Sequence, residues 1–373
     1  MSRAAAFVRA WFAEPAPTFE ARTPSARWGK VASHAARREL RVVEVFDETP
    51  STRTFVLEPT DTARPLVYEA GQHLTLLIDI AGVTHRRCYS FSSSPASGLR
   101  PAITVRRTPE GVVSRHLHEH VRTGDTLVAT EPSGQFTLAT QPALERAIVF
   151  VAGGVGITPL ISLAETLLRE EPQSHAVLLC GNRCEDEIIF RERLGALEAE
   201  FAPRLFVRHA LDQPPADWNG STGALDGART LQLLGTTDAD AYYVCGPEAM
   251  MTDVCNALAG AGVAPDRVRT ERFAYASSTT TRIPTHSAEL TFTASGVRVT
   301  AKPGQTILQA GLEAGVDLPS SCTMGGCGAC KVRKTSGEVV MSEPNCLGEL
   351  EREAGYVLAC CSYADTNVTI ENH

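Results

Sequence analysis

Hydrophobic and polar positions alternate in short runs along residues 39–140, where Gly, Pro and Thr turns separate runs such as LRVVEVF, TRTFVLEP and HLTLLID. A period of two places the apolar side chains of a strand on one face, toward a core. Several such strands joined by turns predict a small antiparallel β-barrel.

The pattern changes over residues 141–275, where strand-like apolar runs alternate with helix-like runs. The strand-like runs are AIVFVAGG, HAVLLCGNR, RLFVRHAL and DAYYVCGP. The helix-like runs are ITPLISLAETLLRE, EDEIIFRERLGALEAEF and EAMMTDVCNALAGAG. This alternation predicts an α/β domain with a parallel sheet, and ligands of such sheets bind at the carboxyl ends of the strands.

Two segments, residues 1–38 and 276–286, show neither pattern. The first begins with apolar positions on one face of a possible short helix and continues with Pro and Arg. We expect a loosely docked N-terminal extension there, with a partner-docking helix as the alternative. The second is polar and contains one proline, which predicts an extended linker to a third domain at residues 287–373.

Composition and charge narrow the class of protein. The 373 residues suffice for two or three domains, and no run approaches the roughly 18 apolar residues that a membrane span needs. The net charge of −8 argues against nucleic-acid binding. Eleven cysteines without a secretory signal indicate a reducing compartment, so we expect a cytoplasmic location.

Four cysteines near the C-terminus have the spacing of an iron–sulfur site. The run CTMGGCGACK contains a C-x4-C-x2-C motif, and another cysteine follows in GYVLACC. A [2Fe–2S] cluster of the plant ferredoxin type takes three thiolates from one loop and the fourth from a separate segment. The predicted ligands are Cys322, Cys327, Cys330 and Cys360, and Gly325, Gly326 and Gly328 allow the loop to turn sharply around a cluster.

Zinc or disulfides are the alternative uses of these cysteines. A zinc site would show paired C-x2-C knuckles or histidine partners, whereas this segment has one knuckle and no histidine near it. Residues 287–373 also resemble plant-type ferredoxins, because VTAKPGQTILQAGLEAGVDLPSSC is similar to that family's strand, helix and approach to the cluster. The resemblance implies an α+β β-grasp domain, and the family's LAC pattern favours Cys360 over Cys361 and leaves Cys346 as a non-ligand.

The predicted barrel contains RCYSFSSSP at residues 87–95 and ITVRRTPEGVVSRHLHE at 103–119. In this order they resemble the flavin-binding domain of the ferredoxin–NADP reductase superfamily, whose R-x-Y-S-x-x-S motif is matched by Arg87, Tyr89, Ser90 and Ser93. The resemblance implies that Tyr89 stacks on the flavin ring, Ser90 bonds near its N5 atom and Arg87 pairs with the pyrophosphate.

A helix that opens after this motif is expected to supply backbone N–H groups to the flavin phosphates. The residues involved are Gly111, Val113 and Ser114. The following EPSGQF resembles superfamily members that use FAD, so we choose FAD over FMN.

The second domain contains GGVGITP at residues 153–159 and CGP at 245–247, both at strand-to-helix junctions. Together they resemble the pyridine-nucleotide domain of the same superfamily. The expected contacts with the dinucleotide come from Gly153, Gly154, Gly156 and Thr158, and those beside the nicotinamide come from Cys245, Gly246 and Pro247.

Three further residues complete the candidate site. Arg183 meets either a 2′-phosphate or a surface carboxylate. Because only one basic residue is evident at the expected adenosine end, we favour NADH over NADPH. The segment with Glu271 and Phe273 resembles the superfamily segment whose aromatic residue returns to the flavin.

The three modules together predict an NAD(P)H-dependent reductase, because nicotinamide gives up electrons in pairs, a [2Fe–2S] centre takes them singly, and a flavin converts between the two. The whole chain after residue 40 resembles reductase components of multicomponent oxygenases and desaturases. We expect a separate acceptor protein, with a Rieske-type oxygenase first and a diiron hydroxylase or desaturase, a cytochrome P450 or a hybrid-cluster protein as alternatives. A redox-sensing or electron-carrying protein without turnover is the rival class.

Overall fold

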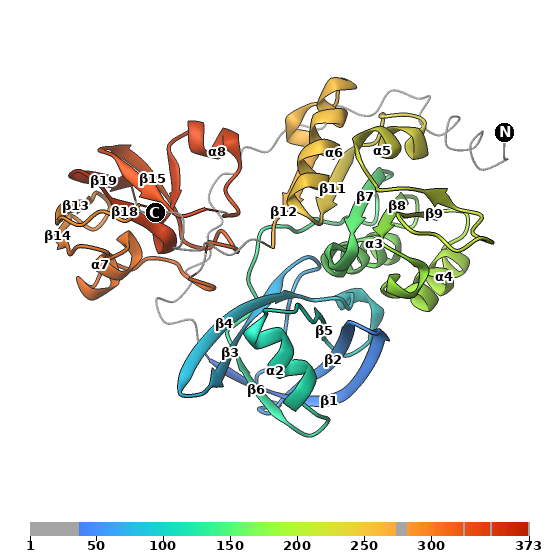
Figure 1. Cartoon of the computed structure of the whole chain (residues 1–373), viewed down its shortest axis with the longest axis horizontal. Coiled ribbons are helices and arrows are strands. Elements are labelled where there is room, and N and C mark those ends of the chain that lie inside the picture. The colour runs from blue at the N-terminus through green and yellow to red at the C-terminus, as the bar shows by residue number, and fades with distance from the viewer. Residues whose placement is uncertain (1–36, 274–281, 324, 344, 372–373) are drawn as a thin grey trace.

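The structure is a computed structural model that describes residues 37–273, 282–323, 325–343 and 345–371. All but the last two residues of the predicted N-terminal extension, and much of the predicted linker, lie outside these residues, and the first strand already begins at Arg38. Strands form a barrel, a parallel sheet and a third, mixed sheet, and Figure 1 shows them as three separate groups. Within the described ranges, no helix has the length and apolar character that a membrane crossing requires.

The barrel is a six-stranded antiparallel sheet in the order β4-β3-β6-β1-β2-β5. Its inward-facing side chains, such as Leu40, Leu57 and Leu74, are fully buried, and the bridge between Phe91 and Ile103 brings the end of β4 to β5. The elements are β1 (Arg38–Thr49), β2 (Thr52–Pro59), β3 (His73–Ile80), β4 (Val83–Ser90), β5 (Ala102–Arg106), α2 (Val112–His120) and β6 (Thr126–Ala129). The predicted antiparallel barrel is confirmed.

The second group is a parallel sheet in the order β10-β9-β8-β7-β11-β12. Its strands are β7 (Ala147–Gly153), β8 (His175–Asn182), β9 (Leu205–Leu211), β10 (Ser221–Thr222), β11 (Ala241–Cys245) and β12 (Val268–Glu271). Its helices are α3 (Ile157–Glu170), α4 (Arg191–Glu200), α5 (Gly227–Leu234) and α6 (Glu248–Gly260). The predicted α/β fold with a parallel sheet is therefore confirmed.

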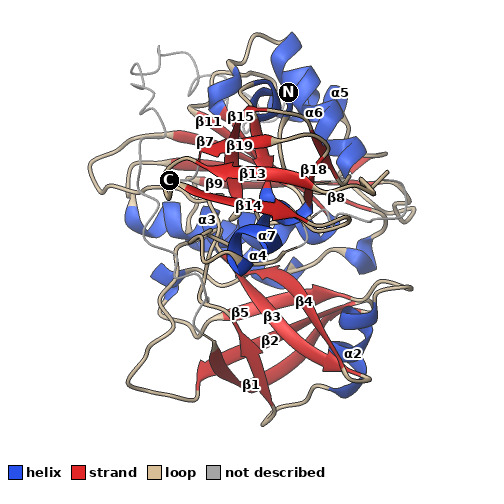
Figure 2. Cartoon of the chain, turned by 90° about the vertical axis from the view of Figure 1, so that its left-hand side faces the viewer, coloured by secondary structure: helices blue, strands red, loops and turns tan. Residues whose placement is uncertain are grey.

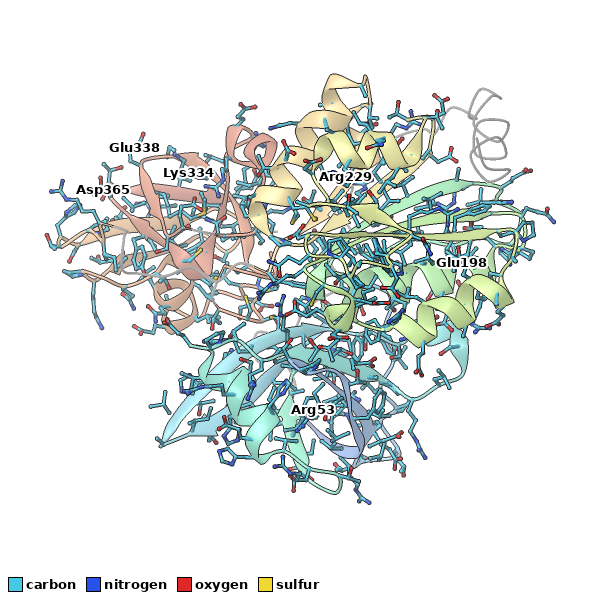
Figure 3. The ribbon with its side chains drawn as sticks, turned by 45° about the vertical axis from the view of Figure 1, so that its right-hand side comes forward. Arg53, Glu198, Arg229, Lys334, Glu338 and Asp365 are labelled. Carbon is cyan, nitrogen blue, oxygen red and sulfur yellow. The ribbon has the colours of Figure 1, made fainter. Side chains whose placement is uncertain are left out.

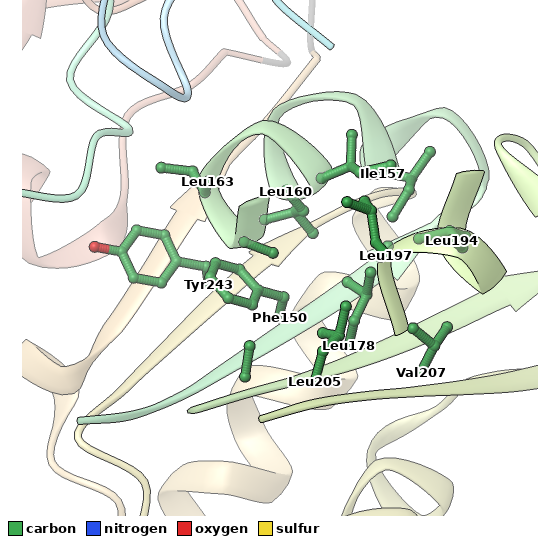
Figure 4. Close-up of a cluster of buried hydrophobic side chains, with 14 of the residues drawn as sticks. Phe150, Ile157, Leu160, Leu163, Leu178, Leu194, Leu197, Leu205, Val207 and Tyr243 are labelled. Carbon is green, nitrogen blue, oxygen red and sulfur yellow. The ribbon is translucent and has the colours of Figure 1, made fainter. Parts of the chain in front are cut away.

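Helices cover both faces of this sheet. Figure 4 shows the core on one face, where Leu160 of α3 and Leu197 of α4 pack on Phe150 and Leu178 of the strands. Met251 of α6 is among the residues that form the core on the other face. Because both faces of the sheet are buried under helices, the strands are almost continuously hydrophobic.

One predicted helix begins later than the sequence pattern indicates. The run EDEIIFRERLGALEAEF predicts a helix from its first residues, but the α-helix begins at Arg191. Ile188, Ile189 and Phe190 are all buried, and Phe190 has a left-handed φ of 62°. Three consecutive side chains cannot lie on one face of a helix, so this segment leaves the helical path to bury all of them.

The C-terminal group has a five-stranded sheet in the order β14-β13-β19-β15-β17 and a β16–β18 pair. Thr306 and Gln309 form a capping box at the start of α7, whose Gly311 lies close to Phe292. The elements are β13 (Ala288–Phe292), β14 (Val297–Ala301), α7 (Ile307–Glu313), β15 (Lys331–Ser336), β16 (Val339–Met341), α8 (Glu349–Glu353), β17 (Tyr356–Leu358), β18 (Ser362–Ala364) and β19 (Val368–Glu371). The α+β prediction is confirmed.

Buried hydrogen bonds join the barrel to the nucleotide domain. The Ser162 hydroxyl of α3 donates to the Ser93 carbonyl at 2.7 Å, and the Ser94 and Thr166 hydroxyls are 2.7 Å apart. In Figure 2 the barrel strands lie below the sheets of the other two domains. The segment that follows β4 therefore meets α3 at the boundary between these two domains.

Candidate functional site

The four predicted cluster cysteines lie as two pairs. Cys327 and Cys322 are hydrogen-bonded to each other, and so are Cys330 and Cys360. Among the described residues, no three His, Cys, Asp or Glu side chains are grouped as ligands of one metal ion. Two thiol pairs suit a cluster of two irons, each held by two cysteines, better than a single zinc ion.

The loop between these cysteines turns through left-handed backbone. Gly325 and Gly328 have φ values of 75° and 71°, which a residue with a Cβ adopts only with strain. The Gly325 N–H donates to Cys360 Sγ at 3.2 Å. Hydrogen bonds from Cys330 and Cys361 lower the pKa of Cys360 to about 5. A thiolate, the form that binds iron, is thus stabilised at this position.

The two cysteines predicted as non-ligands lie near this site. The buried Cys361 thiol shares its single proton between Cys360 and the Leu358 carbonyl, which is 3.8 Å from its sulfur. Cys346 Sγ is 3.7 Å from the position that a Cβ on Gly328 would take. Burial raises the pKa of Cys346 to about 12. The neutral thiol of Cys346 suits the predicted non-ligand role, which stays a prediction.

The flavin motif occupies the end of β4. Arg87 and Tyr89 are half-buried, whereas Ser90 is buried and its hydroxyl donates to Glu271 Oε2 at 3.3 Å. Arg87 Nη1 also donates to the Arg86 carbonyl at 2.7 Å. A hydroxyl, a ring and a guanidinium, the three kinds of group that a flavin requires, therefore follow one another on one strand.

Two other predicted flavin residues are engaged within the protein. The Ser93 hydroxyl lies 2.7 Å from the Tyr68 hydroxyl and accepts from the Ala102 N–H at 2.9 Å. The Ser114 hydroxyl is 3.2 Å from the Thr108 hydroxyl and donates to the Gly111 carbonyl at 3.2 Å. These hydroxyls shape the loops, so the backbone is the part left to meet a phosphate.

The helix α2 begins where the sequence predicts. Gly111 is its N-cap, and a Cβ there would lie 2.1 Å from Thr108 Oγ1, so a larger residue would displace that hydroxyl. The Val113 side chain is buried in the barrel core. Val113 thus offers a backbone N–H alone, as expected for a phosphate site at a helix N-terminus.

The two nucleotide loops pack directly against each other at the carboxyl ends of β7 and β11. A Cβ on Gly156 would lie 2.1 Å from the Cys245 carbonyl oxygen, and one on Gly153 would lie 2.5 Å from Pro247 Cδ. A Cβ on Gly246 would likewise lie 2.9 Å from Gly153 Cα. Because β8 follows β7 on one side and β11 lies on its other side, this is the point where the strand order reverses, the usual ligand site of such sheets.

Two other glycine-loop residues have defined surroundings. Gly154 has a φ of 51°, and a Cβ there would lie 3.2 Å from Arg106 Nη1. The buried Thr158 hydroxyl donates to the Val155 carbonyl at 3.0 Å. Arg106, at the end of β5, also pairs with Glu187 at 3.5 Å. The sequence motifs did not single out Arg106, because the fold alone brings it to the glycine loop.

Glu271 connects the flavin and nucleotide residues. It is the register partner of Cys245 and accepts the hydrogen bond of Ser90. Desolvation raises the pKa of Glu271 to about 8, against the smaller lowering effect of Ser90. Burial, and then the charge of Glu271, raise the pKa of Cys245, so this thiol is protonated at neutral pH. Sequence reasoning assigned no chemical role to Glu271, because only the pairing of β12 with β11 reveals its surroundings.

The last two predicted residues lie at the edges of the site. Arg183 is exposed at the end of β8, and its Nε lies 3.4 Å from Gln213 Oε1. Phe273 is 38% exposed. An exposed aromatic ring beside Glu271 suits a residue that a flavin covers, and both assignments stay predictions.

Comparisons with known proteins agree with this arrangement. Residues 39–138 match the oxidoreductase FAD-binding domain, residues 150–256 the oxidoreductase NAD-binding domain, and residues 290–365 the 2Fe-2S iron-sulfur cluster binding domain. The glycine betaine monooxygenase reductase subunit of Pseudomonas aeruginosa is 31% identical over 357 residues, covering 90% of this chain and 95% of that protein.

Two further proteins are similar over most of their length. One of the subunits of the 1,2-phenylacetyl-CoA epoxidase of Escherichia coli is 32% identical over 340 residues, covering 86% of this chain and 93% of that protein. The structure of phthalate dioxygenase reductase superposes with a TM-score of 0.57 at 23% identity, covering 90% of this chain and 98% of that one, and so shares the fold.

The residues present fit the groups that these domains hold. Two thiol pairs can ligate a [2Fe–2S] cluster, glycines leave room for two dinucleotides, and a hydroxyl–carboxyl pair lies between the two nucleotide motifs. The cofactors are FAD, a nicotinamide nucleotide and a [2Fe–2S] cluster, and the activity is that of an NAD(P)H:acceptor oxidoreductase. The chain belongs to the ferredoxin–NADP reductase superfamily, among the oxygenase reductase components with a C-terminal [2Fe–2S] domain.

Proposed function

We propose that this reductase takes electrons from NADH and delivers them to a terminal oxygenase of the Rieske type. The observation that carries the proposal is the junction at which Ser90, Glu271 and Cys245 meet, with the cluster loop docked on the same barrel through Ser321. FAD bound there would supply the conversion of a hydride pair of electrons into single electrons.

The chain's own residues orient the reactants at this junction. Arg87 would pair with the flavin pyrophosphate, Tyr89 would stack on the ring, and the Ser90 hydroxyl would bond at its reactive edge. The buried Cys245 side chain would pack where the nicotinamide meets the flavin and would exclude water there. Glu271 holds Ser90 in place and keeps its own proton at neutral pH, because its pKa is raised to about 8.

NADH is the proposed donor. Arg183 is the basic side chain at the predicted adenosine end, and it is exposed and engaged with Gln213. A single exposed guanidinium supports a 2′-phosphate weakly compared with a cluster of basic groups. Turnover with NADH is expected to exceed turnover with NADPH, and a ratio of kcat/KM in favour of NADPH would contradict the assignment.

The cluster domain is the proposed exit for electrons. Residues 287–373 contain ten Asp or Glu and six Lys or Arg, a net charge of −4. Figure 3 shows Glu338 and Asp365 at the end of this domain that lies away from the nucleotide domain, and both are exposed. A basic patch on the acceptor would be steered toward such a surface, so electron delivery should slow as ionic strength rises.

The acceptor class rests on chemistry and on the relatives. The P. aeruginosa relative is named as the reductase subunit of a monooxygenase and the E. coli relative as part of an epoxidase, so a protein that activates oxygen is the expected class of partner. Plant-type clusters work near about −400 mV, which suits reduction of a higher-potential Rieske centre. A cytoplasmic location is proposed with this partner, because none of the eleven cysteines, all of which lie in the described ranges, forms a disulfide.

A panel of acceptors tests the proposal. Purified holoprotein and NADH are mixed anaerobically with a Rieske-type oxygenase, a diiron hydroxylase or a cytochrome P450, and each acceptor is followed by its own absorbance. We expect the Rieske centre to be reduced fastest, with a rate that falls with salt. If another class is reduced faster, that class replaces the Rieske-type oxygenase as the proposed acceptor. If none is reduced although NADH is oxidised, the role as an oxygenase reductase is contradicted.

A further inference from the structure

Cys88 of the flavin barrel lies against the cluster cysteines of the C-terminal domain. It occupies the variable position of the RCYS run on β4, between Arg87 and Tyr89. Its single S–H is shared between the sulfurs of Cys322 and Cys327, one of the two thiol pairs of the cluster site. The same sulfur lies 3.3 Å from Thr75 Oγ1 on β3. Cys88 therefore connects a barrel strand to a ligand pair of another domain.

The strand register places Cys88 in line with the flavin-binding serine. Cys88 pairs with Thr75 and Ser90 pairs with His73 across β3 and β4. Alternate residues of a strand share a face and lie about 7 Å apart along it. One face of β4 thus carries the Ser90 hydroxyl, at the predicted flavin edge, and the Cys88 thiol, at the cluster ligands.

The cluster loop is held on this face by polar contacts of Ser321, the residue before the first ligand. Its hydroxyl is 2.8 Å from Thr75 Oγ1 and 3.3 Å from Ser133 Oγ. Its carbonyl accepts from Arg86 Nη1 at 3.3 Å. Contacts from β3, β4 and the loop after β6 fix the loop against the barrel, and Thr75 bonds to both Ser321 and Cys88.

Cys88 is the hydrogen-bond donor to the cluster ligands. Cluster ligands are thiolates, which only accept hydrogen bonds, whereas a non-ligand cysteine at neutral pH carries its proton. A donor to a ligand sulfur stabilises the reduced cluster more than the oxidised one, because the reduced cluster carries an additional negative charge. The hydrogen bond therefore raises the reduction potential of the cluster.

We propose that Cys88 is a positioning residue for electron transfer, whose S–H group bonds to the Cys322 and Cys327 ligand pair, raises the cluster potential and holds the cluster against the flavin strand. In the step itself one electron moves from flavin to cluster. Cys88 is neither oxidised nor reduced, it keeps its proton, and no covalent bond forms or breaks. The inference rests on the proposed function only for the direction of electron flow.

The test compares holoprotein variants Cys88→Ala and Cys88→Ser with the wild type. Iron and sulfide content, the EPR spectrum of the reduced cluster and its midpoint in a dithionite titration are measured first, because none of them requires NADH. Cys88→Ala should keep two irons but shift the distribution of electrons away from the cluster three- to tenfold. At 59 mV per tenfold change, this lowers the midpoint potential of the cluster by about 30 to 60 mV. Cys88→Ser keeps a donor and should recover part of the shift.

Stopped-flow reduction by NADH then separates the flavin from the cluster. Cys88→Ala should slow cluster reduction by the flavin several-fold while ferricyanide reduction, which draws on the flavin, keeps its rate. Cys255→Ala on α6 is the control thiol and should change neither. An unchanged midpoint and cluster rate in Cys88→Ala would overturn the proposal, and so would loss of iron in both Cys88 variants, since that would make Cys88 a ligand.

The outcomes also distinguish this proposal from the proposed function. If NADH fails to reduce the wild type while dithionite titrations still show the Cys88→Ala shift, the assignment of NADH as the electron donor fails. The role of the Cys88 hydrogen bond then stands. If NADH reduces all proteins and the midpoints coincide, the reductase role stands and the role of Cys88 is refuted.

Discussion

At the scale of single residues, Glu271 is the group whose chemistry depends most on the fold. Its folded-state pKa of about 8 lies above its usual value of 4.5, because desolvation disfavours the carboxylate. A raised carboxyl pKa stabilises the fold fully below pH 4.5, and this contribution falls as pH rises and is lost above about 8.

Glu271→Gln should remove this pH dependence. The wild type is expected to lose stability relative to the variant between pH 5 and 9, by at most about 1.4 kcal/mol per pH unit and less where water reaches the half-buried side chain. Thermal unfolding of the holoproteins at pH 5, 7 and 9 measures the difference. Glu248→Gln, at an exposed ion pair with Arg272, is the control. Parallel curves for wild type and Glu271→Gln would refute the raised pKa.

Arg87→Ala should weaken the retention of flavin. The half-buried guanidinium is predicted to pair bidentately with the pyrophosphate, and loss of a charge-assisted hydrogen bond costs about 1.5–3 kcal/mol, or roughly ten- to a hundredfold in affinity. FAD content after extended dialysis is the measurement. Arg100→Ala, whose side chain is 65% exposed beside Glu58, should retain flavin. Equal occupancy in both variants would remove Arg87 from the site.

The sequence predicts the residues of motifs better than their surroundings. The spacing of the cysteines and the glycines needs no fold to be recognised. Glu271 is recognised only as part of a family-like segment and Arg106 is not recognised at all, because their surroundings depend on β12 pairing with β11 and on β5 ending at the glycine loop. The sequence also does not reveal that the Ser93 and Ser114 hydroxyls are already engaged, since their partners belong to the folded loops.

At the scale of elements, the contact between the GGVG and CGP loops is the feature that fixes the nucleotide site. Gly156→Ala places a methyl group 2.1 Å from the Cys245 carbonyl oxygen, and rigid backbone cannot move aside easily. We expect a loss of stability of about 2 kcal/mol or more together with a raised KM for NADH. Unfolding and initial-rate measurements together show both effects.

Gly195→Ala is the matched control for this prediction. Gly195 lies within α4, a Cβ on it would have nothing within 4 Å, and its φ is not left-handed. Alanine there should stabilise the protein by about 0.5–1 kcal/mol and leave the KM for NADH unchanged. A destabilised Gly195→Ala, or a Gly156→Ala that behaves like the wild type, would contradict the packing described here.

Most elements follow from the hydrophobic pattern, and the exceptions have physical causes. Period-two runs predict the barrel, and apolar runs between helices predict the parallel sheet. The start of α4 is mispredicted because Ile188, Ile189 and Phe190 are buried together in a non-helical segment. The pattern did not indicate α5, a short helix capped by the Asp226 side chain.

At the scale of the whole molecule, the three domains should act in series. Cys327→Ser removes a thiolate from one ligand pair, so we expect loss of the cluster absorbance and of NADH-dependent cytochrome c reduction. Ferricyanide reduction should survive, because it draws on the flavin. Protein that retains FAD yet loses both activities would contradict this order. Cys255→Ala should keep both.

The order of the domains is visible in the sequence, but their junctions are not. The contacts of Ser321 with Thr75 and Ser133, and of Cys88 with the cluster pair, join residues more than 180 positions apart. Neither serine nor cysteine is unusual where it stands in the chain. Only the folded structure shows that the cluster loop lies on the strand that carries the flavin motif.

The central claim is that electrons enter as a pair from NADH and leave singly through the cluster. The most direct test is an anaerobic titration of the purified holoprotein with NADH. Flavin absorbance and the EPR signal of the [2Fe–2S] centre are both measured at each step of the titration. We expect the flavin to bleach and the reduced-cluster signal to grow until it accounts for one spin per chain. A flavin that bleaches while the cluster stays EPR-silent, although dithionite reduces it, would contradict the claim.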